Sequence, residues 1–300
     1  MTRYLALFLW VLRIARGEEI TRTGWAKHWH TPLSSKQQGG LPAHNSSHHT
    51  CTNETAISRD EINGIKPSRG YHLPEEFQPD DLFQAYTNLR DDYRRVSSSN
   101  DGWKLLADRD GVQVSMMSHP GDPLCPYVRM RSVFPTPVED CWNFLKVSNW
   151  DYSMPKMDPF YEGVDCFQEL DHKGLHLILC RKRTKRILAF AKRDLVFLSV
   201  ADQPLEDGTW VSGTVSVHTD AIPRQEGYTR AFQDSVAFYK PLENNTKTEV
   251  TITCRIDLND SGEGGSGGFI PMWLYVRTIG TTGVSSIVNM REALVDHQAE

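Results

Sequence analysis

The stretch GGFIPMWLYVRTIGTTGVSSIVNMREAL, residues 267–294, decides the fold that this sequence predicts. Its apolar residues recur at helical spacing, so it predicts a long amphipathic helix close to the end of the chain. One line along that helix is large at both ends and small in the middle: Trp273, Val276, Gly280, Val284, Ile287, Arg291 and Leu294. Because Gly280 and Gly283 each lower helix stability by about 1 kcal/mol relative to alanine, we interpret the missing bulk as room for a ligand under a flexible lid. The alternative interpretation is a helix that kinks only to follow the surface beneath it.

Upstream of this helix, short segments alternate between apolar and polar residues and are separated by turn residues. They read GWKLLADRDG, VQVSMMSH, YVRMRSVF, HLILCRKR, DLVFLSVAD, TWVSGTVSVHT, YTRAFQDSVAFY and KTEVTITCRIDL. Helical spacing precedes them at 79–96 and interrupts them at 137–157, so the predicted order is helix, three strands, helical insert, six strands, long helix. Eight or nine strands joined by short turns pair as hairpins, which predicts an α+β fold with a curved antiparallel sheet and the terminal helix across its concave side.

The composition and the N-terminal residues limit the classes of protein to which this chain can belong. The chain has 300 residues, 39% of them hydrophobic, and a net charge of −5, which argues against nucleic acid as a partner. Residues 1–17 predict a signal peptide, because Arg3 precedes a short apolar run; a short amphipathic helix is the alternative. Residues 18–78 are rich in Ser and His without apolar periodicity, which predicts a flexible leader without a metal site. The domain is expected at 79–297.

The expected location follows from the signal peptide. We expect the protein to be secreted or in the secretory lumen, with a cytoplasmic protein peripheral on membranes as the alternative. Sequons at Asn45, Asn53, Asn244 and Asn259 would matter only in the secretory pathway. The six cysteines show no metal-type spacing, and their pairing cannot be assigned from their order.

Five segments, in the same order, resemble the START (steroidogenic acute regulatory protein-related lipid transfer) domain family, above all its phosphatidylcholine transfer protein type. They read DGWKLLADRDGVQV, SNWDYSMPKM, KRDLVFLS, EGYTRAFQ, and GGFIPMWL followed by GTTGVSSIVNMREA. The resemblance covers residues 80–295. It implies a helix-grip fold in which the sheet wraps around the terminal helix and encloses a tunnel for one lipid, with phospholipid favoured over sterol.

The resemblance also implies lipid-binding residues. Arg131 matches a strand position that carries a charged cavity residue in sterol-binding relatives, and Gln233 matches a glutamine that contacts the headgroup in the phosphatidylcholine type. The full predicted set is Arg131, Gln233, Trp273, Val276, Gly280 and Val284. Where the phosphatidylcholine type has a phosphate-binding arginine, this chain has Ser148 and Asn149, so the resemblance does not imply that headgroup.

A gate is implied at the loop between the fifth and sixth strands, which falls at residues 181–193. On the residues alone, this basic run beside apolar side chains is typical of a membrane-interface segment, and a solvated strand end is the alternative. The predicted gate and membrane-contact residues are Arg181, Lys182, Arg183, Lys185, Arg186, Ile187, Leu188 and Phe190.

Two other function classes share this predicted fold. An enzyme would need acid–base groups, for which His218, Asp220 and Asp234 are the candidates although no spacing links them. A lipid sensor would bind without transfer. The stretch NDSGEGGSGG contains the glycine spacing of a dinucleotide-binding loop, but it lacks the βαβ unit that such a loop needs. It also contains the spacing of a nucleophile elbow at Ser266, but it lacks the tight turn that an elbow needs. We therefore predict a non-enzymatic, monomeric lipid-transfer protein without cofactor or metal that docks transiently on membranes.

Overall fold

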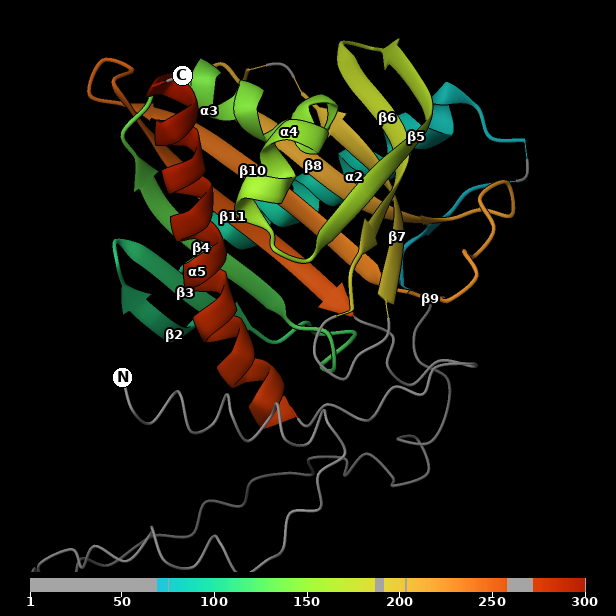
Figure 1. The fold of residues 1–300 in the computed structure, drawn as a ribbon, viewed down its shortest axis with the longest axis horizontal. Helices are drawn as coiled ribbons and strands as arrows, with labels where there is room; N and C mark the ends of the chain where they lie inside the picture. Colours follow the sequence, from blue (N-terminus) through green and yellow to red (C-terminus); the bar gives the residue numbers. More distant parts are fainter. Residues whose placement is uncertain (1–68, 75, 187–191, 203, 258–271, 300) are drawn as a thin grey trace, which may run out of the picture. The chain divides into compact units, whose positions relative to one another are not determined.

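The structure is a computed structural model that describes residues 69–74, 76–186, 192–202, 204–257 and 272–299, with side chains of the last range described from Thr278 to Gln298. The described residues form one large curved sheet with helices on both faces (Figure 1). This architecture confirms the predicted α+β helix-grip fold.

The elements follow one another in a simple order. They are β1 (Tyr71–His72), α2 (Pro79–Ser98), β2 (Lys104–Arg109), β3 (Val112–Met117), β4 (Tyr127–Phe134), α3 (Val138–Leu145), the 3-10 helix η3 (Val147–Asn149), α4 (Trp150–Met157), β5 (Tyr161–His172), β6 (Leu175–Thr184), β7 (Lys192–Ala201), β8 (Trp210–His218), β9 (Tyr228–Arg230), β10 (Phe232–Leu242), β11 (Lys247–Asp257) and α5 (Met272–Ala299). The sheet order is β2-β3-β4-β11-β10-β8-β7-β6-β5, all antiparallel, while β1 adds in parallel to β8 and β9 to β7. The turn between β2 and β3 is tight: its two residues, Asp110 and Gly111, both have positive φ, as a two-residue hairpin turn requires.

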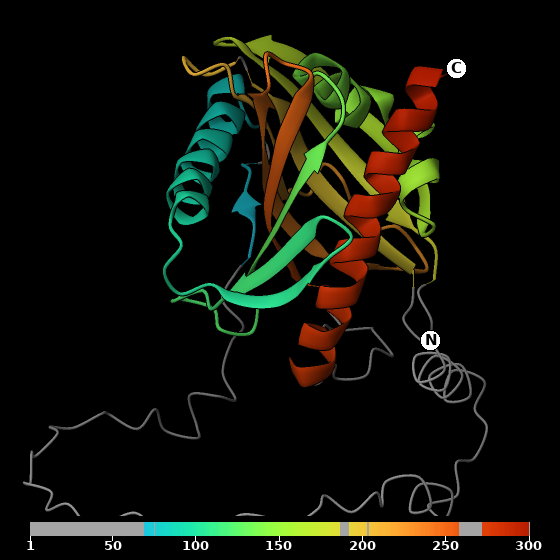
Figure 2. The same ribbon diagram turned by 90° about the vertical axis from the view of Figure 1, so that its left-hand side faces the viewer.

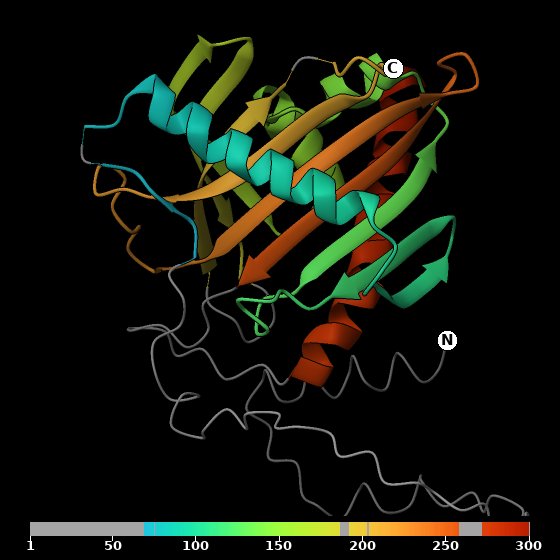
Figure 3. The ribbon, with the colours of Figure 1, turned by 180° about the vertical axis from the view of Figure 1, so that it is seen from behind.

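Helix α2 covers the outer face of the sheet (Figure 3). It begins at Pro79, and the carboxylate of Asp81 accepts a hydrogen bond of 2.8 Å from the backbone N–H of Gln78, so the predicted start of this helix is confirmed. Its apolar side packs on β6, β7 and β8 through Leu82 and Tyr86. A side chain at Gly213 would come within 2.7 Å of the Tyr86 ring, so glycine allows this close approach.

Helix α5 crosses the inner, concave face of the sheet, on the side opposite α2 (Figure 2). Its described part buries Val284, Ile287 and Leu294 in the main core cluster. The two glycines do not border empty space: a methyl group at Gly280 would contact Leu106, and one at Gly283 would lie 3.3–3.4 Å from Val114 and Met130. They allow the helix to lie close against β2, β3 and β4, which differs from the predicted room for a ligand.

Two parts of the fold extend beyond the predicted segments. The sequence does not predict the long edge strand β5, because half of its twelve side chains are exposed, and a strand that is exposed to solvent on both faces shows no clear alternation. The strand β1 lies in the predicted leader, and Leu73 just after it is buried in the core cluster beneath α2. Residues 71–73 of the predicted leader are therefore part of the fold.

The five cysteines in the described part of the chain, Cys125, Cys141, Cys166, Cys180 and Cys254, are unpaired. Within the described residues, no helix has the length and apolarity needed to cross a bilayer.

Candidate functional site

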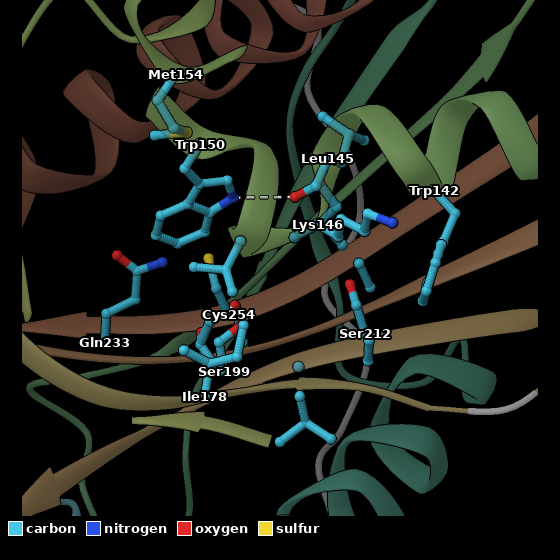
Figure 4. A pocket seen from close by; sticks show the side chains of 18 of the residues that line it. Trp142, Leu145, Lys146, Trp150, Met154, Ile178, Ser199, Ser212, Gln233 and Cys254 are labelled. Atoms are coloured by element: carbon cyan, nitrogen blue, oxygen red, sulfur yellow. Dashed lines mark hydrogen bonds between the residues drawn. The ribbon is translucent and has the colours of Figure 1, made fainter. Parts of the chain in front are cut away.

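A cavity of about 460 Å³ lies between the inner face of the sheet and the α3–α4 segment (Figure 4). This volume falls in the range of about 300–1,000 Å³ that is usual for ligand pockets. Two cross-strand rows of the sheet form its floor. The first row runs through Ala201, Ser212, Ala237 and Ile252, and the second through Ser199, Thr214, Ser235 and Cys254.

The floor is low because its residues are small. Equivalent inward positions elsewhere on the same strands carry large side chains, such as Leu195 and Phe197 on β7, and these fill their space. At Ala201, Ser212 and Ala237, the side chains end at or one atom beyond Cβ, so the volume above them stays open. The hollow is therefore encoded by the strands β7, β8 and β10, and not by the glycines of the last helix.

The roof is built by the helical insert. Trp142 and Leu145 from α3, Val147 from η3, and Trp150 and Met154 from α4 line the cavity from above. The indole N–H of Trp150 donates to the carbonyl of Leu145 at 3.0 Å, and its ring packs against Phe197 with centroids 5.5 Å apart. Trp150 is thereby oriented by both the roof and the sheet (Figure 4).

Methionines close the sides of the cavity. Met130 comes from β4, Met157 from the end of α4 and Met290 from α5. The flexible, polarisable thioether side chain adapts its shape at low cost, which suits a wall that contacts hydrocarbon of variable shape.

Polar groups face the cavity at several points. Gln233 projects from β10 into the cavity on the side of Trp150 (Figure 4). Lys182 lines it from β6 and donates to a carboxylate oxygen of Asp158 at 2.9 Å, so its charge is paired. On the floor, the hydroxyls of Thr214 and Ser235 are hydrogen-bonded at 2.7 Å. The cavity can thus enclose a mainly apolar ligand and hold a polar group of it.

The structure distributes the predicted lipid-binding residues unevenly. Gln233 lines the cavity, and its contact with a lipid stays a prediction. Arg131 does not, because its neighbour Met130 faces the cavity and successive strand residues face opposite sides. Its guanidinium instead donates to the carbonyl of Ser97 at 3.1 Å, beside Arg129, which donates to the carbonyls of Ser97 and Ser99. Both arginines therefore satisfy the C-terminal carbonyls of α2 on the outer face.

The remaining lid residues lie apart from the described cavity. Gly280 and Val284 are buried against the sheet and do not line it. The side chains of Trp273 and Val276 lie outside the described residues. The contribution of α5 to the described cavity is Met290, which was not among the predicted residues.

The residues of the predicted gate fall into three groups. Arg181, Lys182 and Arg183 lie in β6 and not in a loop, where Arg181 and Arg183 both pair with Asp165 on the outer face. Lys185 and Arg186 follow the strand and are exposed. Ile187, Leu188 and Phe190 lie outside the described residues.

The acid–base candidates do not form a catalytic group. The ring of His218 stacks on His72 and bonds the carbonyl of Arg69, while Asp220 is exposed. Asp234 faces the outer side of the sheet, where burial raises its pKa to about 7 although it accepts a 2.8 Å hydrogen bond from the Ser216 N–H. None of the three lines the cavity, and the described residues contain no cluster of ligands for a metal ion.

The residues that shape the site were missed in the sequence. Ser199, Ser212, Thr214 and Ser235 occupy alternate strand positions that an apolar core would fill with Val or Leu. A run of small or hydroxyl residues at every second position of three neighbouring strands is the signal that predicts such a hollow.

Comparisons with known proteins bear on the same region. The START domain family matches residues 84–300. Comparison with curated proteins finds no match. Human StAR-related lipid transfer protein 5 aligns at 20% identity over 74% of this chain and 100% of that chain, with a TM-score of 0.63. Human STARD10 aligns at 15% identity over 77% and 83% of the two chains, with a TM-score of 0.58. At these identities the two structures establish a shared fold.

Proposed function

Because the chain belongs to the START domain family, we propose that it binds one lipid in the cavity and transfers it between membranes without altering it chemically. The observation that carries the proposal is the cavity of about 460 Å³ between a floor of small residues and a roof of apolar ones. The lipid-transfer name of the human relative with this fold agrees with it.

Burial of hydrocarbon would supply most of the affinity. Each methylene removed from water contributes about 0.8 kcal/mol, so a dozen methylenes contribute roughly 10 kcal/mol before the cost of ordering the chain. Trp142, Trp150, Met154, Ile252 and Ile256 provide the apolar contacts for such a chain. The roof must move for a lipid to enter, since it covers the floor.

We favour a phospholipid over a sterol as the ligand. A sterol offers a single hydroxyl group, whereas the cavity presents polar groups on several strands, including Gln233 and the hydroxyls of the floor. Buried polar groups without partners are costly, so a ligand with several hydrogen-bonding atoms matches this lining better. A closer relation to the phosphatidylcholine transfer protein type is part of this proposal.

Transfer requires contact with membranes. Lys185 and Arg186 are exposed at the end of β6, and each basic residue near an anionic surface contributes about 1 kcal/mol to binding. Charge reversal of both to glutamate should slow transfer between anionic liposomes by tenfold or more and leave stoichiometric lipid binding intact. The matched control is charge reversal of two exposed residues on other elements, Arg94 and Lys240.

A fluorescent phosphatidylcholine transferred from donor to acceptor liposomes provides the readout. Binding without any transfer by the wild-type protein would favour a lipid sensor over a transfer protein. If the control reversal slowed transfer as much as the Lys185/Arg186 reversal, the docking surface would not be at the end of β6.

We also propose that the protein enters the secretory pathway, on the basis of the apolar run after Arg3. Asn244 then provides a direct test, because this sequon lies exposed in the turn between β10 and β11. Glycosidase treatment of protein secreted from cells should lower its mass, and Asn244→Gln should remove part of that shift. Protein retained in the cytoplasm with no glycan would contradict this location.

A further inference from the structure

Five hydroxyl groups meet on the floor of the cavity. They belong to Ser199 on β7, Ser212 and Thr214 on β8, and Ser235 and Tyr239 on β10, and we refer to them together as the hydroxyl floor. In the sheet register, Ser199 is paired with Thr214, and Thr214 with Ser235. The groups therefore lie across three adjacent strands, which are about 4.8 Å apart.

The hydrogen bonds among these hydroxyl groups leave some hydroxyl hydrogens without an acceptor. Thr214 bonds Ser235 at 2.7 Å and Ser212 bonds Tyr239 at 3.1 Å, so two of the five hydroxyl hydrogens are engaged. The other three find no acceptor among the described residues. The hydroxyl of Ser199 takes part in neither pair, although this residue is only 7% exposed and lines the cavity. The hydroxyl floor therefore presents hydrogen-bond donors that a bound molecule has to satisfy.

The hydroxyl floor is also uncharged. Two titratable side chains that line the cavity are paired with carboxylates: Lys182 with Asp158, and His176 with Asp171. Lys146 donates to the amide oxygen of Asn143 at 3.0 Å. None of these cations belongs to the hydroxyl floor, so a carboxylate or phosphate placed on the floor would be buried without a cation among the groups that bind it, which is costly. An alkyl chain there would leave the donors unsatisfied, at about 1–3 kcal/mol for each buried group.

A neutral group that only accepts hydrogen bonds fits best. The carbonyl oxygen of an ester has this property, and a lipid with acyl esters brings one such oxygen per chain next to its polar end. We propose that the hydroxyl floor binds the ester carbonyl oxygens of an acyl-ester lipid and thereby selects this class over ether lipids and hydrocarbons. This inference rests on the proposed function, since it requires a lipid in the cavity.

The test compares two lipids that differ only in these carbonyls. The probes are a diacyl phosphatidylcholine and the dialkyl ether phosphatidylcholine with the same headgroup and chain lengths. Binding is followed by the fluorescence of Trp142 and Trp150, which line the cavity. The wild-type protein should bind the ester lipid at least about tenfold more tightly than the ether lipid. A tenfold difference in Kd corresponds to roughly 1.4 kcal/mol, which comes from hydrogen bonds that an ether oxygen accepts less well than an ester carbonyl.

A triple variant removes three of the five hydroxyls, those of the second cross-strand row, with little change in shape: Ser199→Ala, Thr214→Val and Ser235→Ala. Two of the three spare donors are lost, so its Kd ratio for ether over ester should fall well below that of the wild-type protein, mainly because the ester binds less tightly. Thr253→Val is the matched control, since this hydroxyl bonds Ser97 on the outer face and does not reach the cavity. It should keep the tenfold ratio even if it lowers the melting temperature.

The outcomes separate the inference from the proposed function. Equal binding of ester and ether by the wild-type protein would overturn the inference and leave lipid binding intact. Failure of the wild-type protein to bind either probe would overturn both. A triple variant that folds and keeps the full ester preference would also overturn the inference. If the triple variant does not fold, Thr214→Val alone and the wild-type comparison decide the question.

Discussion

Replacement of Ala237 by leucine tests whether the space above the floor is empty. Ala237 lies in the middle of the first cross-strand row and lines the cavity. Leucine adds three carbon groups, about 90 Å³ at the roughly 30 Å³ that a water occupies in the liquid. This is about one fifth of the cavity volume, so the side chain should fit without displacing its neighbours.

The expected energies follow from burial. Three additional buried carbon groups contribute about 2 kcal/mol, so the free energy of unfolding of the ligand-free protein should rise by up to that amount. The same carbons occupy space that a lipid needs, so lipid affinity should fall by about tenfold or more. Urea unfolding measures the first effect, and lipid titration followed by tryptophan fluorescence measures the second.

Ala85→Leu is the matched control on the outer face. Ala85 is 3% exposed and belongs to the packed cluster beneath α2, where an enlarged side chain should cost about 1–3 kcal/mol. Its lipid affinity should stay unchanged. If Ala237→Leu destabilised the protein as much as Ala85→Leu does and left lipid binding intact, the floor would be packed and the reasoning refuted.

Three further predictions concern other parts of the fold. The pKa of Asp234 is about 7 in the folded protein and near 3.8 in the unfolded chain. The free energy of unfolding of the wild-type protein should therefore fall by up to about 4 kcal/mol as the pH rises from 3.8 to 7. Asp234→Asn should remove this pH dependence in urea unfolding, and a variant with the wild-type pH profile would contradict the assignment. Gly283→Leu should lower stability by about 1–3 kcal/mol because its side chain meets Met130, and a thermal scan with no change would argue against close packing there. Arg230→Ala should lower the free energy of unfolding by about 3–5 kcal/mol, because it leaves the fully buried carboxylate of Asp194 unpaired. Thermal unfolding measures this loss, and a loss under 1 kcal/mol would show that water reaches the carboxylate.

The fold could be predicted from the sequence because the patterns that indicate each helix and most strands are local. Pro79 with two aspartates in the first turn marked α2, and the helical spacing after Pro137 marked the α3–α4 segment. The family resemblance on five ordered segments is confirmed by the match over residues 84–300. The edge strand β5 could not be predicted in this way, because exposure of both its faces removes the alternation on which the prediction rests.

The site was harder to predict from the sequence, because it depends on which face of the sheet each strand residue lies on. Arg131 and Met130 are adjacent in sequence, but Met130 faces the cavity and Arg131 faces α2, and no local pattern tells which of the two faces inward. The glycines of the last helix predict a hollow in the wrong place, since glycines that leave empty space and glycines that allow close packing look alike in a sequence. Only the register showed that Ala201, Ser212 and Ala237 form one row beneath the roof.

The central claim is that the space between this floor and the α3–α4 roof holds one lipid. Native mass spectrometry of the full chain, purified after exposure to liposomes of mixed phospholipids and sterol, tests it most directly. The account predicts one additional mass per protein chain, identified as a lipid by fragmentation, and its loss in the double variant Ala201→Leu/Ala237→Leu. A wild-type protein that shows only its own mass under these conditions, or a lipid that remains bound to the folded double variant, would contradict it.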